Sequence, residues 1–209
     1  MDNLIFVLNG PSAGGKTILL ETITGEKLIK GIESLSDMAK LVTVTTRNPR
    51  PEEIEEIHYY FVTPDEFQKK KREGDVVEET VYAGVQYGIF DSEIQRIRNA
   101  NKDALVILDK HGISEMKRFY GDKNVISIFV YRDLKDIFAE LKRRPVSMQE
   151  TMKRFEQAKE EMKNISICDY AVYNISTVQD LAKDAIRIIQ KERSKKRRRE
   201  IKQCQSGRA

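Results

Sequence analysis

The sequence predicts an α/β fold in which a parallel sheet is flanked by helices and carries a small inserted mixed subdomain. Two observations support this fold class. Short apolar runs alternate with segments that have helical spacing and N-terminal caps. Residues 45–90 break this alternation, because they are rich in Tyr and charge and contain short alternating segments.

The first expected strand is the apolar run Leu4–Leu8, which Asn9-Gly10-Pro11 closes. A continuous apolar run is typical of a strand buried on both faces, as in a parallel sheet. A helix should follow from Gly15. Further strands are expected at residues 41–44, 104–108, 125–130 and 170–173.

Three helix starts carry capping patterns. A Ser or Thr precedes an acidic residue by three positions at Thr63, Ser147 and Thr177, so each is expected to cap a helix.

Length and composition favour one globular domain. The chain has 209 residues, of which 40% are hydrophobic and 33% are charged. Its apolar runs are too short to span a bilayer, and its start lacks the pattern of a secretory signal, so we expect no membrane partner. Two cysteines, Cys168 and Cys204, without metal-ligand spacing, predict neither a disulfide framework nor a zinc site and fit the cytoplasm.

The net charge of +4 is unevenly distributed. Residues 191–209 hold nine Lys/Arg and two Asp/Glu, a net of +7, which leaves −3 for the rest of the chain. This basic C-terminal tail is expected to be disordered or to extend a helix. It could touch nucleic acid non-specifically, but such tails are more often only solvated, and we assign it no function.

A phosphate-binding motif follows the first strand. The segment Gly10-Pro11-Ser12-Ala13-Gly14-Gly15-Lys16-Thr17 fits G-x-x-x-x-G-K-[ST], and its position between a strand and a helix is the context that this motif requires. In such a P-loop, backbone N–H groups surround phosphate oxygens, Lys16 bridges the β and γ phosphates of ATP, and the Thr17 hydroxyl ligates Mg²⁺. A P-loop NTPase core is therefore predicted.

A second candidate phosphate site is a proline-stiffened loop after the expected strand at residues 41–44. Arg47 and Arg50 stand three apart in a segment that Pro49 and Pro51 keep extended. Tyr59, Tyr60, Tyr82 and Tyr87 could add hydroxyls, and Glu78 could accept from a base N–H pair. From the residues alone, a phosphate site and plain surface charge are equally open.

The order of motifs resembles that of the guanylate kinase family from Leu4 to about Gln190. The matching segments are the P-loop, Thr45-Thr46-Arg47-Asn48-Pro49-Arg50-Pro51, Tyr59-Tyr60-Phe61-Val62 with Glu66-Phe67, Tyr87-Gly88, Arg154, and Asp169–Asn174. The resemblance implies ATP-dependent phosphorylation of a nucleoside monophosphate, GMP or dGMP, so ATP with Mg²⁺ and a nucleoside monophosphate are the expected partners.

Residue roles follow from the resemblance position by position. It implies that Arg47, Arg50, Tyr59 and Tyr87 hold the acceptor phosphate, and that Thr43, Glu78 and Asp109 face the guanine. Arg144, or its neighbour Arg143, would act with Arg154 as a lid over the transferring group, beside the catalytic Lys16. No general base is needed, because the attacking group is already a phosphate anion. His58 and His111 are accordingly interpreted as structural or surface residues.

The expected organisation is a single guanylate kinase-like domain over residues 1–190. Its core comprises residues 1–42, 91–140 and 156–190, its acceptor-binding subdomain residues 43–90, and its lid residues 141–155.

The chain departs from the family pattern at three places. Ile89 stands where a hydroxylated residue usually bonds the guanine, and Ile107 stands where the first Asp of Asp-x-Asp is usual. The lid segment also lacks one residue, which leaves the choice between Arg143 and Arg144 open. Two alternatives therefore stay open, namely a kinase for a different phosphorylated acceptor and a guanylate kinase-like binding module with weak or no catalysis.

Overall fold

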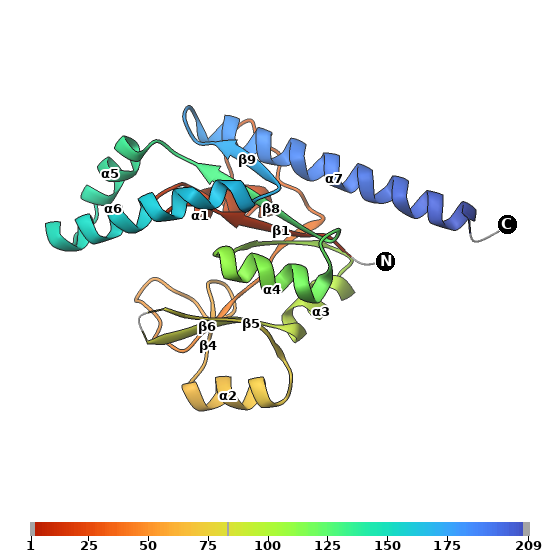
Figure 1. The fold of residues 1–209 in the computed structure, drawn as a ribbon, viewed down its shortest axis with the longest axis horizontal. Coiled ribbons are helices and arrows are strands. Elements are labelled where there is room, and N and C mark those ends of the chain that lie inside the picture. The colour runs from red at the N-terminus through yellow and green to blue at the C-terminus, as the bar shows by residue number, and fades with distance from the viewer. Residues whose placement is uncertain (1–2, 83, 207–209) are drawn as a thin grey trace.

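The core of the computed structural model is a five-stranded sheet in the order β2-β7-β1-β8-β9, with every neighbouring pair parallel. The structure describes residues 3–82 and 84–206, without the side chains of Tyr82 and Ser206. The strands are β1 (Ile5–Asn9), β2 (Met38–Lys40), β7 (Asp103–Ile107), β8 (Val125–Tyr131) and β9 (Tyr170–Tyr173). This is the predicted fold class (Figure 1).

Helices cover both faces of this sheet. Leu4, Phe6 and Leu8 pack against α1 (Lys16–Thr24) and α7 (Val178–Ser206) on one face. Ile5 and Val7 pack on the other against α3 (Asp91–Asn99) and α4 (Lys110–Tyr120). Because successive side chains of a strand point to opposite faces, a strand covered on both sides must be apolar throughout. The prediction of a doubly buried first strand is therefore confirmed.

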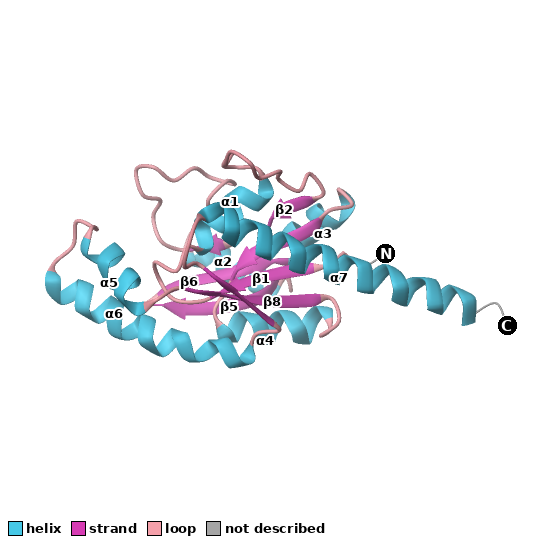
Figure 2. Ribbon diagram, turned by 90° about the horizontal axis from the view of Figure 1, so that it is seen from above, coloured by secondary structure: helices cyan, strands magenta, loops and turns pink. Residues whose placement is uncertain are grey.

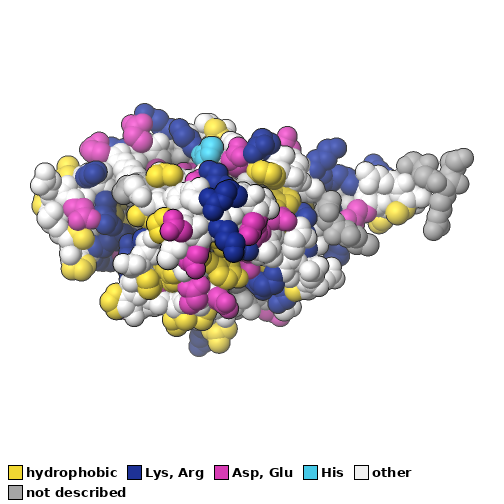
Figure 3. All heavy atoms as spheres, turned by 90° about the horizontal axis from the view of Figure 1, so that it is seen from below, with side chains coloured by type: hydrophobic (Ala, Val, Ile, Leu, Met, Phe, Trp, Pro, Cys, Tyr) yellow, Lys and Arg dark blue, Asp and Glu magenta, His cyan; other side chains and the backbone are white. Residues whose placement is uncertain are grey.

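A second sheet, in the order β4-β3-β6-β5, lies below the core in Figure 1 with α2 (Pro64–Arg72) beneath it. Its strands are β3 (Val44–Thr45), β4 (Tyr60–Phe61), β5 (Val76–Tyr82) and β6 (Val85–Phe90). It mixes one parallel pair with two antiparallel ones. Seen from the α2 side, acidic and basic side chains are interspersed over the surface (Figure 3).

The prediction of a single strand at residues 41–44 is wrong. The sheet strand β2 ends at Lys40, and Val44 already belongs to the second sheet, so the apolar run spans the crossing between the two sheets. Leu41 and Val42 are apolar because they are buried at this crossing, where the Val42 N–H donates to Glu93 Oε1 at 3.0 Å. Burial of this kind gives the same apolar pattern as a strand.

The three predicted helix caps are confirmed. Thr63 accepts from the Glu66 N–H at 3.2 Å, and Glu66 returns a bond to the Thr63 N–H at 2.7 Å, which completes a capping box. Ser147 accepts from Glu150 N–H at 3.2 Å and Thr177 from Asp180 N–H at 3.1 Å.

Two helices form a separate pair beside the core, α5 (Leu134–Lys142) and α6 (Met148–Met162), which a short 3₁₀ turn (Lys163–Ile167) links to β9 (Figure 1). Ile137, Leu141 and Ala158 are buried between them. The proposed lid segment, residues 141–155, therefore covers the end of α5, the connecting loop and the first half of α6.

The last helix, α7, continues through the basic tail to Ser206 and projects beyond the body of the molecule (Figure 2). Arg193 fastens it to the core, with bonds to Asp103 at 2.7 Å and to Asp37 at 2.9 Å. No helix among residues 3–206 with described placement is both long and apolar enough to cross a membrane.

Candidate functional site

The candidate site lies at the carboxyl edge of the core sheet. Four neighbouring parallel strands end there, and each delivers a residue of interest. Asp109 follows β7, the P-loop follows β1, Arg132 follows β8 and Asn174 follows β9. In open parallel sheets this edge is where ligands bind, because the loops and helix N-termini converge there.

The P-loop turns from β1 into α1 with glycines where the backbone requires them. Gly10 has a φ of 136°, and a Cβ added to it would lie 2.6 Å from the Val130 carbonyl oxygen. Gly15, at the N-cap of α1, has a φ of 99° and lies against the Asn174 side chain. Residues other than glycine would be strained and would clash at both positions.

Lys16 folds back over its own loop. Its Nζ donates to the Gly10 carbonyl at 2.6 Å and to the Pro11 carbonyl at 2.8 Å. Burial lowers the pKa of Lys16 to about 8, while Glu161 acts to raise this pKa and Arg144 acts to lower it. The ammonium is thus held at the loop in a position that lacks full hydration, which increases its attraction for a phosphate.

Three side chains that sequence reasoning missed as site residues support the loop. The Ser12 N–H donates to Glu161 Oε2 on α6 at 2.9 Å. Arg132 donates to the Ala13 carbonyl at 2.8 Å, and Asn174 donates to the Gly14 carbonyl at 3.0 Å. Asn174 is the last residue of the family-matching segment Asp169–Asn174, so the sequence offered a pattern that could have identified it. Glu161 and Arg132 lie far from the P-loop in sequence and belong to no such pattern.

Arg47 is held by a carboxylate and two aromatic rings. Its two terminal nitrogens donate to the two oxygens of Glu53, each at 2.6 Å, and its guanidinium lies 5.0 Å from the Tyr59 ring centroid and 5.6 Å from that of Phe61. The hydrogen bonds from Arg47 lower the pKa of Glu53 to about 2. Glu53 also accepts from the Arg50 backbone N–H at 2.8 Å, so one carboxylate organises the whole arginine loop.

Glu53 was not predicted as a site residue. The sequence places Glu53 three residues after Arg50, which is the one pattern that could have identified it. Its pairing with Arg47, however, depends on how the loop folds. The Arg50 side chain is exposed beside Glu53 and His58, and His58 Nδ1 accepts from the Ile54 N–H at 3.0 Å. His58 therefore stabilises the loop, and His111 is exposed on α4.

A pocket of about 170 Å³ brings together the residues expected to face a base, although they come from distant segments. Residues of the second sheet form one wall, and the end of β7 forms the other. The lining residues are Thr43, Tyr59, Glu78, Thr80, Tyr87, Gly88, Ile107, Leu108 and Asp109. The Tyr59 and Tyr87 rings stand edge to face with centroids 6.2 Å apart, which joins this pocket to the Arg47 loop.

Glu78 is the buried acid of this pocket, with 5% of its surface exposed. Burial raises its pKa to about 7, against the effect of a hydrogen bond that Thr80 Oγ1 donates to Glu78 Oε1 at 2.8 Å. Asp109 caps α4 by accepting from the Gly112 N–H at 2.8 Å, and its charge adds to the raised pKa of Glu78.

The three lid arginines differ in position. Arg144 lies near enough to Lys16 for its charge to lower the pKa of that lysine. Arg143 pairs instead with Glu140 at 3.3 Å and has a side chain that is 78% exposed. Arg154 pairs with Glu150 on the same helix. Of the two candidates that the sequence left open, Arg144 is thus the one whose charge reaches Lys16.

The two isoleucines that depart from the family pattern, Ile89 and Ile107, occupy different environments. Ile89 is fully buried in the core cluster with Val77 and Ile94 and does not line the base pocket. Ile107 does line it. The Tyr82 side chain lies outside the described part of the chain.

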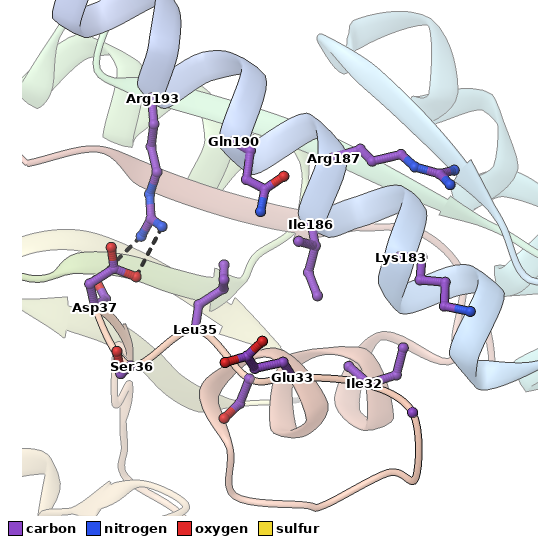
Figure 4. Close-up of a pocket in the computed structure, with 12 residues that line it drawn as sticks. Ile32, Glu33, Leu35, Ser36, Asp37, Lys183, Ile186, Arg187, Gln190 and Arg193 are labelled. Atoms are coloured by element: carbon purple, nitrogen blue, oxygen red, sulfur yellow. Dashed lines mark hydrogen bonds and ion pairs between the residues drawn. The ribbon is translucent and has the colours of Figure 1, made fainter.

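A larger hollow of about 590 Å³ lies elsewhere, between α7 and the loop of residues 31–37 (Figure 4). Arg193 and Asp37 pair at one end of it, and it shares no lining residue with the P-loop or the base pocket. We therefore do not assign it to the site.

Three comparisons with known proteins point to one family. The model of the family described as guanylate kinase matches residues 3–192. A guanylate kinase of Thermotoga maritima is 30% identical over 206 residues, covering 97% of this chain and 93% of the relative. One of Salinibacter ruber is 31% identical over 175 residues, covering 83% and 88%. A crystal structure of guanylate kinase from Anaplasma phagocytophilum has the same fold, with a TM-score of 0.67 at 24% identity over 91% of this chain and 86% of that one.

Proposed function

Because this chain belongs to the guanylate kinase family, we infer that it is a nucleoside monophosphate kinase that transfers a phosphoryl group from ATP to GMP. The observation that carries this inference is the base pocket. It places the buried Glu78 and the exposed Asp109 at the strand edge where the P-loop also opens. A carboxylate accepts only, so ionised Glu78 matches the ring N–H and amino group that guanine presents on one edge.

On the donor side, residues Gly10 to Thr17 bind the phosphates of ATP. The backbone N–H groups at the start of α1 face the phosphate oxygens, and Lys16 exchanges its two carbonyl contacts for the β and γ phosphates. The carbonyls that release Lys16 lie in the same loop, so little rearrangement is needed.

On the acceptor side, Arg47 and Arg50 bind the phosphate of GMP together with the hydroxyls of Tyr59 and Tyr87. Arg47 is already oriented by Glu53 and by the Tyr59 ring, so its guanidinium loses little freedom on binding. Thr43, Glu78 and Asp109 contact the guanine within the base pocket.

Transfer requires two anions to approach. An oxygen of the acceptor phosphate attacks the γ-phosphorus, and the bond to the β–γ bridging oxygen breaks to release ADP. Lys16, Arg144 and Arg154 offset the repulsion and the charge that spreads over the transferring group. Since Arg144 is already near Lys16, we assign it the lid role in preference to Arg143.

Mg²⁺ fits this donor set as a partner of ATP. The Thr17 hydroxyl is exposed on the first turn of α1 and supplies the hard oxygen ligand that Mg²⁺ prefers. The described residues contain no group of three or more His, Cys, Asp or Glu able to hold a metal ion. The ion would therefore be held by Thr17, the phosphates of ATP and water, and it would neutralise charge on the phosphates.

The free thiols of Cys168 and Cys204 support the proposal of a cytoplasmic location.

The test is an assay that couples ADP release to NADH oxidation, run with ATP, Mg²⁺ and a panel of GMP, dGMP, AMP, CMP, UMP and sugar phosphates. We expect turnover with GMP and dGMP at the highest kcat/KM. No ADP release with GMP, together with turnover of another acceptor, would contradict the proposal. A chain that fails to bind ATP with Mg²⁺ in calorimetry would instead favour the alternative of a guanylate kinase-like binding module with weak or no catalysis.

A further inference from the structure

The base pocket contains a hydroxyl that the sequence comparison did not point to. Position 89, where the family usually has a hydroxylated residue, is an isoleucine buried in the core. Thr80 on β5 lies in the pocket instead, two residues after Glu78 and therefore on the same face of the strand. Thr80 is paired in register with Tyr87, another pocket residue.

The Thr80 hydroxyl is directed at one atom of Glu78. It donates to Oε1 at 2.8 Å, and among the described residues it is the one hydrogen-bond donor to this carboxylate. Oε1 also faces the first turn of α4, because a Cβ added to Gly112 would lie 3.3 Å from it. Glu78 is thus fixed between a hydroxyl on its own strand and the N-terminus of a helix of the core.

We propose that Thr80 is a positioning residue for the acceptor base, whose hydroxyl holds the Glu78 carboxylate in the orientation and ionised form that receive guanine. This proposal rests on the function inferred above, in which Glu78 binds the base. Thr80 acts through Glu78, since its hydroxyl is occupied by the carboxylate.

The physical reason is the competition that burial creates at Glu78. Burial and the neighbouring charges of Asp109 and Glu115 favour the protonated acid, whereas His111 and the Thr80 hydrogen bond favour the carboxylate. The pKa of Glu78 is raised to about 7, so near neutral pH the two forms are balanced. A protonated Glu78 would present a donor to the guanine N–H groups and lose the match.

Removing the hydroxyl should therefore change the pH dependence of GMP binding. In Thr80→Val the pKa of Glu78 rises further, so GMP needs a higher pH to bind. We expect the midpoint of GMP affinity against pH to move up by about one unit, which makes binding about tenfold weaker below that midpoint. At high pH, where Glu78 is ionised in both proteins, the two affinities should approach within a few-fold.

The experiment is calorimetric titration of GMP into the full chain from about pH 6 to pH 9, with the wild type, Thr80→Val and Thr80→Ser. Serine keeps the hydroxyl and should restore the wild-type midpoint. Thr24→Val is the matched control, since it removes a half-buried hydroxyl that bonds the Leu20 carbonyl at 3.0 Å on α1. It should leave the midpoint unchanged, and thermal unfolding of every variant shows that each one folds.

The outcomes separate the two proposals. If the wild type binds GMP and Thr80→Val shows the same midpoint, Thr80 does not position Glu78 and the inference fails while the function stands. If Thr80→Val is weaker by one constant factor at every pH, the hydroxyl acts only in packing and the inference again fails. If the wild type binds no GMP at any pH, the proposed function fails and the role of Thr80 fails with it.

Discussion

The P-loop and the base pocket are assembled in contrasting ways. The P-loop is one segment of eight consecutive residues, Gly10 to Thr17, whose proposed phosphate-binding groups are mainly backbone N–H groups. The base pocket takes its lining from residues 43 to 109, from two sheets, and its proposed contacts with the base are made by side chains. Donor chemistry is thus a local property of this chain, while acceptor choice depends on how the second sheet is placed against the core.

The largest expected effect tests the P-loop. Lys16→Ala should lower kcat by about 10³-fold or more, because no other described cation contacts the Gly10 and Pro11 carbonyls where the ammonium lies. GMP affinity by calorimetry should stay within about twofold, since the base pocket is separate. Lys27→Ala, exposed just after α1, is the control. A large loss of GMP affinity would show that the two sites are not independent.

The next effect concerns the lid. Arg144→Ala should lower kcat by about 10²-fold, and Arg143→Ala by less than about threefold, because Arg144 lies near Lys16 while Arg143 is exposed and paired with Glu140. Steady-state kinetics with saturating ATP and GMP measure both. Equal losses in the two variants would mean that the lid rearranges enough to exchange its arginines.

Arg47→Ala should raise the KM for GMP by about 10- to 100-fold with a smaller loss in kcat. It removes a cation and leaves the Glu53 carboxylate unpaired near the acceptor phosphate. In the double variant Arg47→Ala/Glu53→Gln, the KM for GMP should be lower than in Arg47→Ala alone, because the carboxylate charge that repels the acceptor phosphate is gone. Arg72→Ala, exposed at the end of α2, is the control. An unchanged KM for GMP in Arg47→Ala would refute the assignment.

The smallest expected effect is a shift along the pH axis. The pKa of Lys16 is lowered to about 8, so its charged form is present below that pH and is lost above it. The kcat/KM for ATP, which reports the free enzyme, should therefore fall as pH rises through about 8. Glu161 acts to raise the pKa of Lys16, so Glu161→Gln should move this alkaline limb to lower pH. A limb that stays in place would show that Glu161 supports Ser12 alone.

The sequence predicts the local features of this molecule better than the features that distant segments assemble. The doubly buried β1, the P-loop and the caps at Thr63, Ser147 and Thr177 depend on neighbours within a few positions, and the structure has these elements where expected. Glu53, Glu161 and Thr80 were missed as site residues because their roles arise from folding. Glu161 meets Ser12 across 149 positions of sequence, and no local pattern records such a contact.

The wrong strand at residues 41–44 has the same origin. Apolar composition reports burial, and Leu41 and Val42 are buried at a crossing between two sheets rather than within one. The choice between Arg143 and Arg144 could not be made from spacing either, since neighbouring residues at a helix end point in different directions and the fold decides which of them approaches Lys16.

The supports of the P-loop also set an order of events during synthesis. The motif is complete when residue 17 leaves the ribosome, but Arg132, Glu161 and Asn174, which bond its backbone, are made much later. Arg193 then joins α7 to β2 and β7 through Asp37 and Asp103. The P-loop is therefore held in its folded shape by side chains that are synthesised well after the motif itself.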